Sequence, residues 1–152
     1  MSAADAALSA SADETEAIAA ELACELAAGA VIHVCGEIGS GKTTFIRGAC
    51  RALGFSGPVT SPSYTICNRY EQGDLLISHL DCQRLEGARG EEAGLLDDEV
   101  GPSRISFIEW PQQSEDAVGA LAEIPASIRV ELGHVSQSQR SIKIIREPAR
   151  CQ

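Results

Sequence analysis

The chain has 152 residues, 44% of them hydrophobic, which is enough for one domain with a buried core. Its formal net charge of −10 argues against a broad basic surface for nucleic acid phosphates, and we expect no contact with DNA. No apolar run reaches membrane-spanning length, and no basic segment precedes an apolar one near the N-terminus. The six cysteines include no C-x-x-C pair, so a zinc site is not expected. These features predict a cytoplasmic, reduced protein without a membrane partner.

The N-terminal region predicts a loose tail followed by a helix. Residues 1–12 are rich in alanine and serine and are expected to form a flexible tail. Ser11 and Glu14 have the spacing of a capping box, which is typical of a helix start. We expect this helix to end at Gly29. Its apolar face comprises Ile18, Leu22 and Leu26.

A strand, a glycine-rich loop and a helix follow in immediate succession. Residues 31–35 are mostly β-branched and apolar, as in a buried parallel strand. The next stretch is Gly36-Glu37-Ile38-Gly39-Ser40-Gly41-Lys42-Thr43-Thr44, which fits the phosphate-binding pattern G-x-x-x-x-G-K-[ST] at every fixed position. Residues 44–53 then have helical spacing, and Gly54 is placed to end that helix in a left-handed conformation. This context predicts a nucleoside triphosphate site.

The residue types of this loop suit a triphosphate and its metal ion. Glycines let backbone N–H groups approach phosphate oxygens, and the N-terminus of the following helix favours negative charge. Lys42 is expected to bridge the β- and γ-phosphates, and the Thr43 hydroxyl is expected to bind Mg²⁺. The predicted cofactors are ATP and Mg²⁺. The candidate nucleotide-binding residues of the loop are Gly39, Ser40, Gly41, Lys42, Thr43 and Thr44.

Two acidic residues further along the chain complete the predicted site. Asp81 ends an apolar strand over residues 75–81, and Glu109 lies near the end of another over 105–110. The carboxyl ends of strands face the ligand crevice in open α/β sheets. A P-loop enzyme needs an acid there to hold Mg²⁺ or to orient the nucleophile. Lys42, Asp81 and Glu109 are therefore the candidate catalytic residues. His79 is either an active-site neighbour or a half-buried strand residue, and taken alone it favours the second interpretation.

The remaining segments complete an α/β prediction. Residues 64–70 are expected to pair with 75–81 through a turn at 71–74, after a loop over 57–64. The predicted fold is a P-loop NTPase-like, mostly parallel sheet flanked by helices, with antiparallel hairpin additions. We expect short helices at 91–96 and 113–121, an antiparallel pair at 126–135 and 140–146, one domain over 13–148 and a tail over 149–152.

Four motifs in this order resemble the TsaE (YjeE) family of small bacterial ATPases. The loop Gly36–Phe45 is similar to the family's G-[DE]-L-G-[AS]-G-K-T-T-[FL]. Residues 60–65, Thr-Ser-Pro-Ser-Tyr-Thr, are similar to its T-S-P-[ST]-[FY]-T. Residues 79–84 resemble H-x-D-x-Y-R, and residues 108–111 match [IV]-E-W-P. Gln83 replaces the tyrosine of the third motif, which puts any role of that tyrosine in doubt.

The resemblance implies a function in making threonylcarbamoyladenosine beside the tRNA anticodon. Such a protein binds ATP and Mg²⁺, assembles with a TsaD–TsaB pair and supports turnover of that assembly by hydrolysing ATP. It meets tRNA through the complex. The family pattern implies Mg²⁺ contacts by Thr43 and Glu109, a role in hydrolysis for Asp81, and a place near the nucleotide for Thr15. Low intrinsic activity is expected, because the sequence offers no obvious arginine finger.

Two other functions use the same loop. A small-molecule kinase would need an arginine-bearing lid and an acceptor pocket, but Arg84, Arg89 and Arg104 are scattered. A nucleotide-dependent regulatory binding module would need only the loop and its helix. A GTPase is disfavoured because no N-K-x-D segment for guanine recognition is present.

Overall fold

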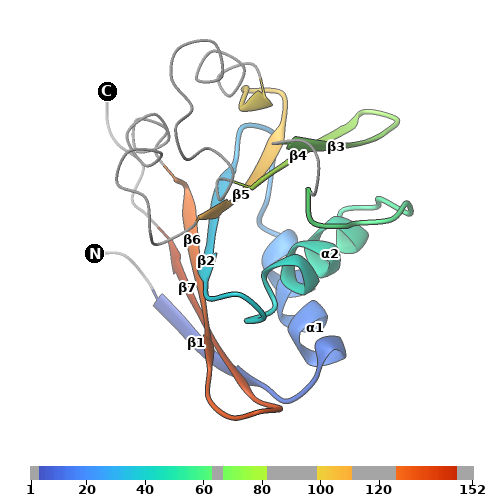
Figure 1. The fold of residues 1–152 in the computed structure, drawn as a ribbon. Coiled ribbons are helices and arrows are strands. Elements are labelled where there is room, and N and C mark those ends of the chain that lie inside the picture. Colours follow the sequence, from blue (N-terminus) through green and yellow to red (C-terminus); the bar gives the residue numbers. More distant parts are fainter. Residues whose placement is uncertain (1–3, 63–66, 82–98, 111–125, 147–152) are drawn as a thin grey trace, which may run out of the picture.

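One sheet and two helices make up the elements of the computed structural model, which describes residues 4–62, 67–81, 99–110 and 126–146. The helices lie side by side against one face of the sheet (Figure 1). They are α1 (Ala12–Ala23) and α2 (Lys42–Ala52). The strands, in their order across the sheet, are β1 (Ala4–Ser9), β7 (Arg140–Arg146), β6 (Ile128–His134), β2 (Val31–Gly36), β5 (Ile105–Trp110), β4 (Leu75–Asp81) and β3 (Cys67–Gln72).

The centre of the sheet is parallel and its edges are antiparallel. Strands β6, β2, β5 and β4 run in the same direction. The outer strands β3, β7 and β1 each pair antiparallel with a neighbour. Strand β2 has parallel strands on both sides and is buried along almost its whole length, which explains its mostly apolar sequence. This arrangement confirms the predicted α/β fold with antiparallel hairpin additions.

Most of the predicted elements within the described residues are confirmed, with small changes at their ends. The β3–β4 turn is tighter than the predicted 71–74, because strand pairing continues to Gln72 and only Gly73 and Asp74 remain in the turn. The pair predicted at 126–135 and 140–146 corresponds to β6 and β7. No described helix is both long enough and apolar enough to cross a membrane. The predicted strand start at 64–66, the helices at 91–96 and 113–121, and the tail at 149–152 lie outside the described residues.

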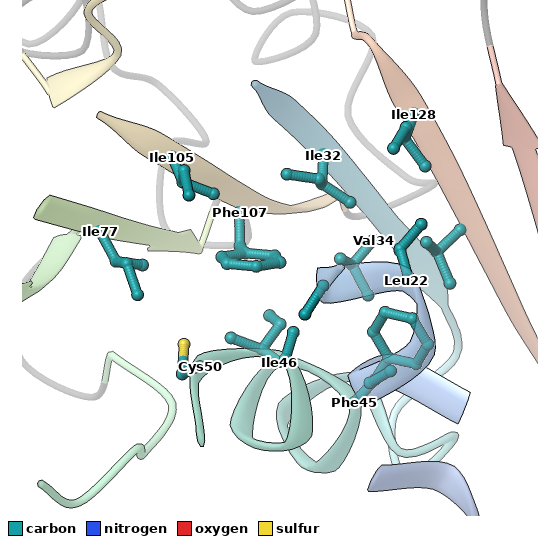
Figure 2. Packing of buried hydrophobic residues seen from close by; sticks show 14 of the residues in the cluster. Leu22, Ile32, Val34, Phe45, Ile46, Cys50, Ile77, Ile105, Phe107 and Ile128 are labelled. Atoms are coloured by element: carbon teal, nitrogen blue, oxygen red, sulfur yellow. The ribbon is translucent and has the colours of Figure 1, made fainter. Parts of the chain in front are cut away.

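The hydrophobic core lies between the helices and the sheet (Figure 2). Alternate residues of β2, Ile32 and Val34, belong to this core together with Phe45 and Ile46 of α2, and all four are completely buried. Burying a side chain of this size contributes about 1.5–3 kcal/mol. The packing therefore holds the first turn of α2 next to the carboxyl end of β2.

The first helix is shorter than its sequence predicts. Ser11 caps α1 as expected, accepting a hydrogen bond from the Glu14 N–H. The helix ends at Ala23 and not at Gly29, so this part of the prediction is wrong. The chain continues in tight turns, and the Gly29 N–H donates to the Arg104 carbonyl at 2.8 Å, just before β5. The segment after Ala23 thus bonds to the residues that lead into β5, and the helix does not continue to Gly29.

The N-terminal segment is part of the sheet, which corrects the expectation of a flexible tail over residues 1–12. Strand β1 pairs with β7 from Ala4 to Ser9. The Ser9 hydroxyl donates to the Ser11 carbonyl at 2.7 Å and lies 2.6 Å from the Thr15 hydroxyl. Alanine is a poor strand former, but the edge of β7 offers unpaired backbone groups that any extended segment can satisfy.

The two helices approach each other most closely at Gly48. A Cβ atom at this position would lie 2.5 Å from the Cα atom of Glu16 in α1. Such a separation is far inside van der Waals contact, so the backbones can touch here only because Gly48 has no side chain. The glycine thereby sets the spacing between α1 and α2.

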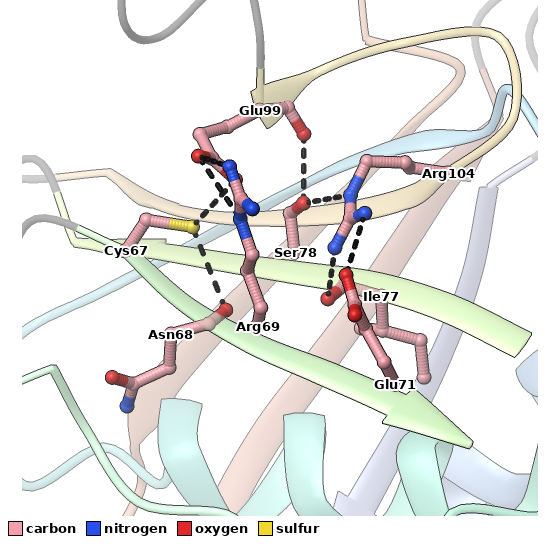
Figure 3. A network of polar contacts seen from close by, with 8 residues as sticks. All are labelled: Cys67, Asn68, Arg69, Glu71, Ile77, Ser78, Glu99 and Arg104. Carbon is pink, nitrogen blue, oxygen red and sulfur yellow. Dashed lines mark hydrogen bonds and ion pairs between the residues drawn. The ribbon is translucent and has the colours of Figure 1, made fainter.

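A polar network joins β3 and β4 to the chain that precedes β5 (Figure 3). Arg69 of β3 donates to the Glu99 carboxylate, with Nε at 2.8 Å from Oε2. Ser78 of β4 donates to the Glu99 carbonyl at 2.7 Å and accepts from Nε of Arg104 at 2.6 Å. Because side chains alternate along a strand, Arg69 and Ser78 lie on the opposite faces of their strands from Tyr70 and His79.

Candidate nucleotide site

The glycine loop connects the end of β2 to the start of α2. Gly41 is the residue before the helix and has φ of 98°, a left-handed conformation that favours glycine. No side chain caps the N–H groups of the first turn of α2. A helix start with uncapped N–H groups attracts anions, because those groups and the helix dipole both favour negative charge. The loop is therefore shaped to receive phosphate.

Lys42 and Ser40 both line this loop. The Lys42 ammonium group donates to the Gly36 carbonyl at 2.6 Å and to the Glu37 carbonyl at 3.3 Å, so it spans the loop from end to end. The Ser40 side chain is completely buried, and its hydroxyl has no hydrogen-bond partner among the described residues. A Cβ atom on Gly36 would lie 2.5 Å from this hydroxyl, so the glycine at the start of the loop leaves room for it.

Thr43 and the two predicted acids are brought together at the carboxyl edge of the sheet. Asp81 and Glu109 are partners in the β4–β5 register, so the two acids lie on adjacent parallel strands. They are 9% and 5% exposed. The Thr43 hydroxyl donates to Oε1 of Glu109 at 3.1 Å. Helix α2 and strand β5 thus place a hydroxyl and a carboxylate side by side.

This pair of oxygen groups suits Mg²⁺. Mg²⁺ prefers oxygen ligands and is usually held by one or two carboxylates together with substrate phosphates and water. The described part of the chain contains no cluster of three or more histidine, cysteine, aspartate or glutamate residues that could hold a metal by itself. A site made of Thr43, Glu109 and a bound triphosphate fits both observations.

His79 has a larger place in the site than its sequence indicates. The expectation of a half-buried strand residue is wrong, because the imidazole is completely buried. Its Nε2 lies 3.0 Å from Oε1 of Glu109, and its Nδ1 lies 2.8 Å from the Tyr70 hydroxyl. Sequence reasoning assigned no role to Tyr70. Side chains alternate along β4, so His79 lies on the same face as Asp81, and this pattern could have indicated a place for His79 in the site.

Thr15 lies in the first turn of α1 and is 3% exposed. Its hydroxyl lies 2.6 Å from the Ser9 hydroxyl, which donates to the Ser11 carbonyl, and 3.2 Å from that carbonyl. These bonds hold the junction between β1 and α1. The placement of Thr15 near the nucleotide remains a prediction, and Gln83 lies outside the described residues.

Comparison with known proteins gives consistent matches. The family model described as "Threonylcarbamoyl adenosine biosynthesis protein TsaE" matches residues 9–142. The Haemophilus influenzae protein named tRNA threonylcarbamoyladenosine biosynthesis protein TsaE is 33% identical over 115 residues, covering 76% of this chain and 69% of that protein. The proteins of the same name from Bacillus subtilis and Synechocystis are 36% and 35% identical, and their matches cover 68% and 61% of this chain. These two matches span 65% and 61% of the relatives, less than two thirds of their length.

A solved structure shares the fold. The crystal structure of Bacillus subtilis YdiB matches with a TM-score of 0.68, covering 96% of this chain and 87% of that one. The sequence identity is 24%, so this likeness supports the fold alone.

Proposed function

The chain belongs to the TsaE family, and on that premise we propose that it is an ATP-binding and ATP-hydrolysing subunit required for threonylcarbamoyladenosine modification of tRNA. The observation that carries this proposal is the hydrogen bond from the Thr43 hydroxyl to Oε1 of Glu109. It joins the phosphate-binding loop to an acid from a different strand. Binding a phosphate needs only the loop and its helix, whereas hydrolysis also needs groups that organise metal and water.

Each residue has a distinct task in the proposed reaction. The N–H groups at the start of α2 and the Lys42 ammonium group bind the β- and γ-phosphates. Thr43 and Glu109 hold Mg²⁺, which offsets negative charge on the phosphate oxygens when it is bound. Asp81, beside Glu109 on β4, orients the water that attacks the γ-phosphate in line with the leaving group.

Slow hydrolysis by the isolated chain is part of the proposal. An arginine that contacts the transferring phosphate typically raises turnover by about 10³–10⁵. Among the described residues, no arginine donates a hydrogen bond to the side chain of Thr43 or Glu109. We propose that a TsaD–TsaB pair supplies the missing groups in the cytoplasm, and that tRNA is met through this complex.

The test is ATP hydrolysis by the purified chain, alone and with a TsaD–TsaB pair from the same source. We expect strong stimulation by the pair. Lys42→Ala, Asp81→Ala and Glu109→Gln should each reduce the stimulated rate by about 100-fold or more, since each removes a group that acts on the reacting phosphate. Undiminished rates in these variants would reject the assigned roles. Binding of ATP without stimulation by the pair would instead favour a kinase or a regulatory module.

Matched controls come from an exposed pair of the same residue types. Glu131 of β6 and Lys143 of β7 face each other across the antiparallel ladder and are both exposed. Glu131→Gln and Lys143→Ala make the same chemical changes outside the site. They should leave stimulated hydrolysis unchanged.

A further inference from the structure

We propose that Tyr70 and His79 form a buried relay that positions Glu109 for metal binding and connects it to the backbone at Thr60. This inference rests on the proposed function, because it concerns the metal site of that function. The relay is the chain of hydrogen bonds from the Thr60 carbonyl through the Tyr70 hydroxyl and the His79 imidazole to the Glu109 carboxylate.

The geometry of the relay is continuous. The Tyr70 hydroxyl donates to the Thr60 carbonyl at 3.0 Å and lies 2.8 Å from Nδ1 of His79. Nε2 of His79 lies 3.0 Å from Oε1 of Glu109. That same Oε1 atom accepts the hydrogen bond from Thr43 at 3.1 Å. One carboxylate oxygen therefore joins the relay to the phosphate-binding loop.

Hydrogen counting defines how the imidazole is held. The Glu109 carboxylate only accepts, so Nε2 of His79 carries the hydrogen of that bond, and Nδ1 is left as an acceptor. The single hydrogen of the Tyr70 hydroxyl then lies within reach of two acceptors, Nδ1 of His79 and the Thr60 carbonyl. Both ring nitrogens are consequently engaged, and the imidazole cannot rotate without breaking two buried bonds. This is the usual role of an outer partner that orients a metal-binding group.

Burial makes the relay rigid. His79 is completely buried, and Tyr70 and Glu109 are each 5% exposed. The Tyr70 ring packs between Phe55 and His79, with centroid separations of 5.0 and 5.8 Å. Hydrogen bonds in such surroundings are costly to break, because the separated groups have no access to water. The relay should therefore hold Glu109 in one orientation before metal binds.

The other end of the relay lies in the Thr-Ser-Pro segment. The Thr60 carbonyl also accepts from the Asn68 side chain at 3.0 Å, and the neighbouring Val59 carbonyl accepts from Arg47 of α2 at 3.2 Å. These two backbone carbonyls attach the segment to β3 and α2. We infer that the position of Thr60 and the orientation of Glu109 are coupled through Tyr70 and His79.

The test measures metal affinity directly, with Mn²⁺ as the probe and a non-hydrolysable ATP analogue bound to the full chain. Electron paramagnetic resonance reports free Mn²⁺ and hence the dissociation constant. Tyr70→Phe keeps the ring and removes only the hydroxyl, and we expect it to weaken Mn²⁺ binding about 10-fold, as outer-partner substitutions do. Binding of the analogue in the absence of metal should change less than about twofold, because the loop itself is unaltered.

Two further variants separate positioning from a general loss of structure. His79→Gln should weaken Mn²⁺ binding at least as much as Tyr70→Phe, and the double variant should be no weaker than His79→Gln, since both act along one path. Ser78→Ala is the matched control, because it also removes a hydroxyl that donates to a backbone carbonyl, on the opposite face of β4. It should bind Mn²⁺ normally.

Three outcomes would count against the proposals. Unchanged Mn²⁺ affinity in Tyr70→Phe would overturn the relay and leave the proposed function standing. An equal loss in Ser78→Ala would also overturn it, by showing a general effect on the sheet. Absence of nucleotide-dependent Mn²⁺ binding in the unsubstituted chain would reject the proposed function itself.

Discussion

The buried imidazole of His33 predicts a loss of stability in mild acid. His33 lies in the middle of β2 and is 8% exposed. Burial, with a smaller effect from the nearby positive charge of Arg129, lowers the pKa of His33 from 6.5 to about 4. The folded chain therefore keeps this imidazole neutral at pH values where the unfolded chain protonates it. The free energy of unfolding should therefore fall as the pH drops from 6.5 toward 4, because the unfolded chain takes up a proton that the folded chain does not.

The size of this loss follows from the two pKa values. Each pKa unit corresponds to about 1.4 kcal/mol, so lowering the pKa from 6.5 to about 4 is worth about 3 kcal/mol at pH 4. Above pH 7 the contribution is close to zero, since neither state is protonated. A loss of this size is a large part of the ordinary stability of a domain, about 5–15 kcal/mol.

The assay is urea unfolding at intervals between pH 7 and pH 4. Acidic groups also titrate in this range, so the informative quantity is the difference between the unsubstituted chain and His33→Gln, which cannot take up the proton. We expect this difference in unfolding free energy to change by about 3 kcal/mol across the range. Arg129→Gln should make the dependence shallower, because it removes the smaller cause of the shift. Parallel curves for the unsubstituted chain and His33→Gln would refute the reasoning.

Three other predictions follow from packing, pairing and burial. Gly48→Val should cost about 1–3 kcal/mol by urea unfolding, because its Cβ would lie 2.5 Å from a backbone atom of α1; Gly101→Ala, with open space around it, is the control, and equal stabilities would contradict this. Deleting residues 1–9 bares the edge of β7 and should increase self-association in sedimentation experiments; an unchanged profile would argue against an edge-covering role. Burial raises the pKa of Cys50 to about 12, so mass spectrometry after thiol labelling at pH 8 should find exposed Cys24 modified well before Cys50; equal rates would show that Cys50 is accessible.

The loop and the acids of the candidate site are predictable from sequence because their signals are local. A phosphate-binding loop needs glycine, lysine and threonine at fixed spacings, since consecutive backbone N–H groups must face one ligand. Asp81 and Glu109 are recognisable because each lies at or near the end of an apolar strand, and parallel strands present such ends at one edge of the sheet. In the structure these acids are register partners on β4 and β5, and Thr43 donates to Glu109.

The link between Tyr70 and His79 lies beyond the reach of that reasoning. Their connection depends on antiparallel pairing between β3 and β4, on both side chains facing α2, and on a carbonyl ten residues away in a loop. No residue type at a fixed spacing marks such a set of contacts. A histidine within an apolar strand is equally compatible with a simple packing role.

The sequence by itself determined the order of the described strands and helices from α1 onward, the phosphate-binding motif and the residues proposed to complete its site. These depend on backbone propensity, hydrophobic periodicity and the chemistry of neighbouring residues, all of which are visible in short stretches of sequence. Tertiary structure alone decided that Ala4–Ser9 joins the sheet, that α1 ends at Ala23, and that Tyr70 reaches Glu109 through His79. The reason is physical: unpaired strand edges, backbone donors and buried polar groups are satisfied by whichever partner the folded chain brings within reach.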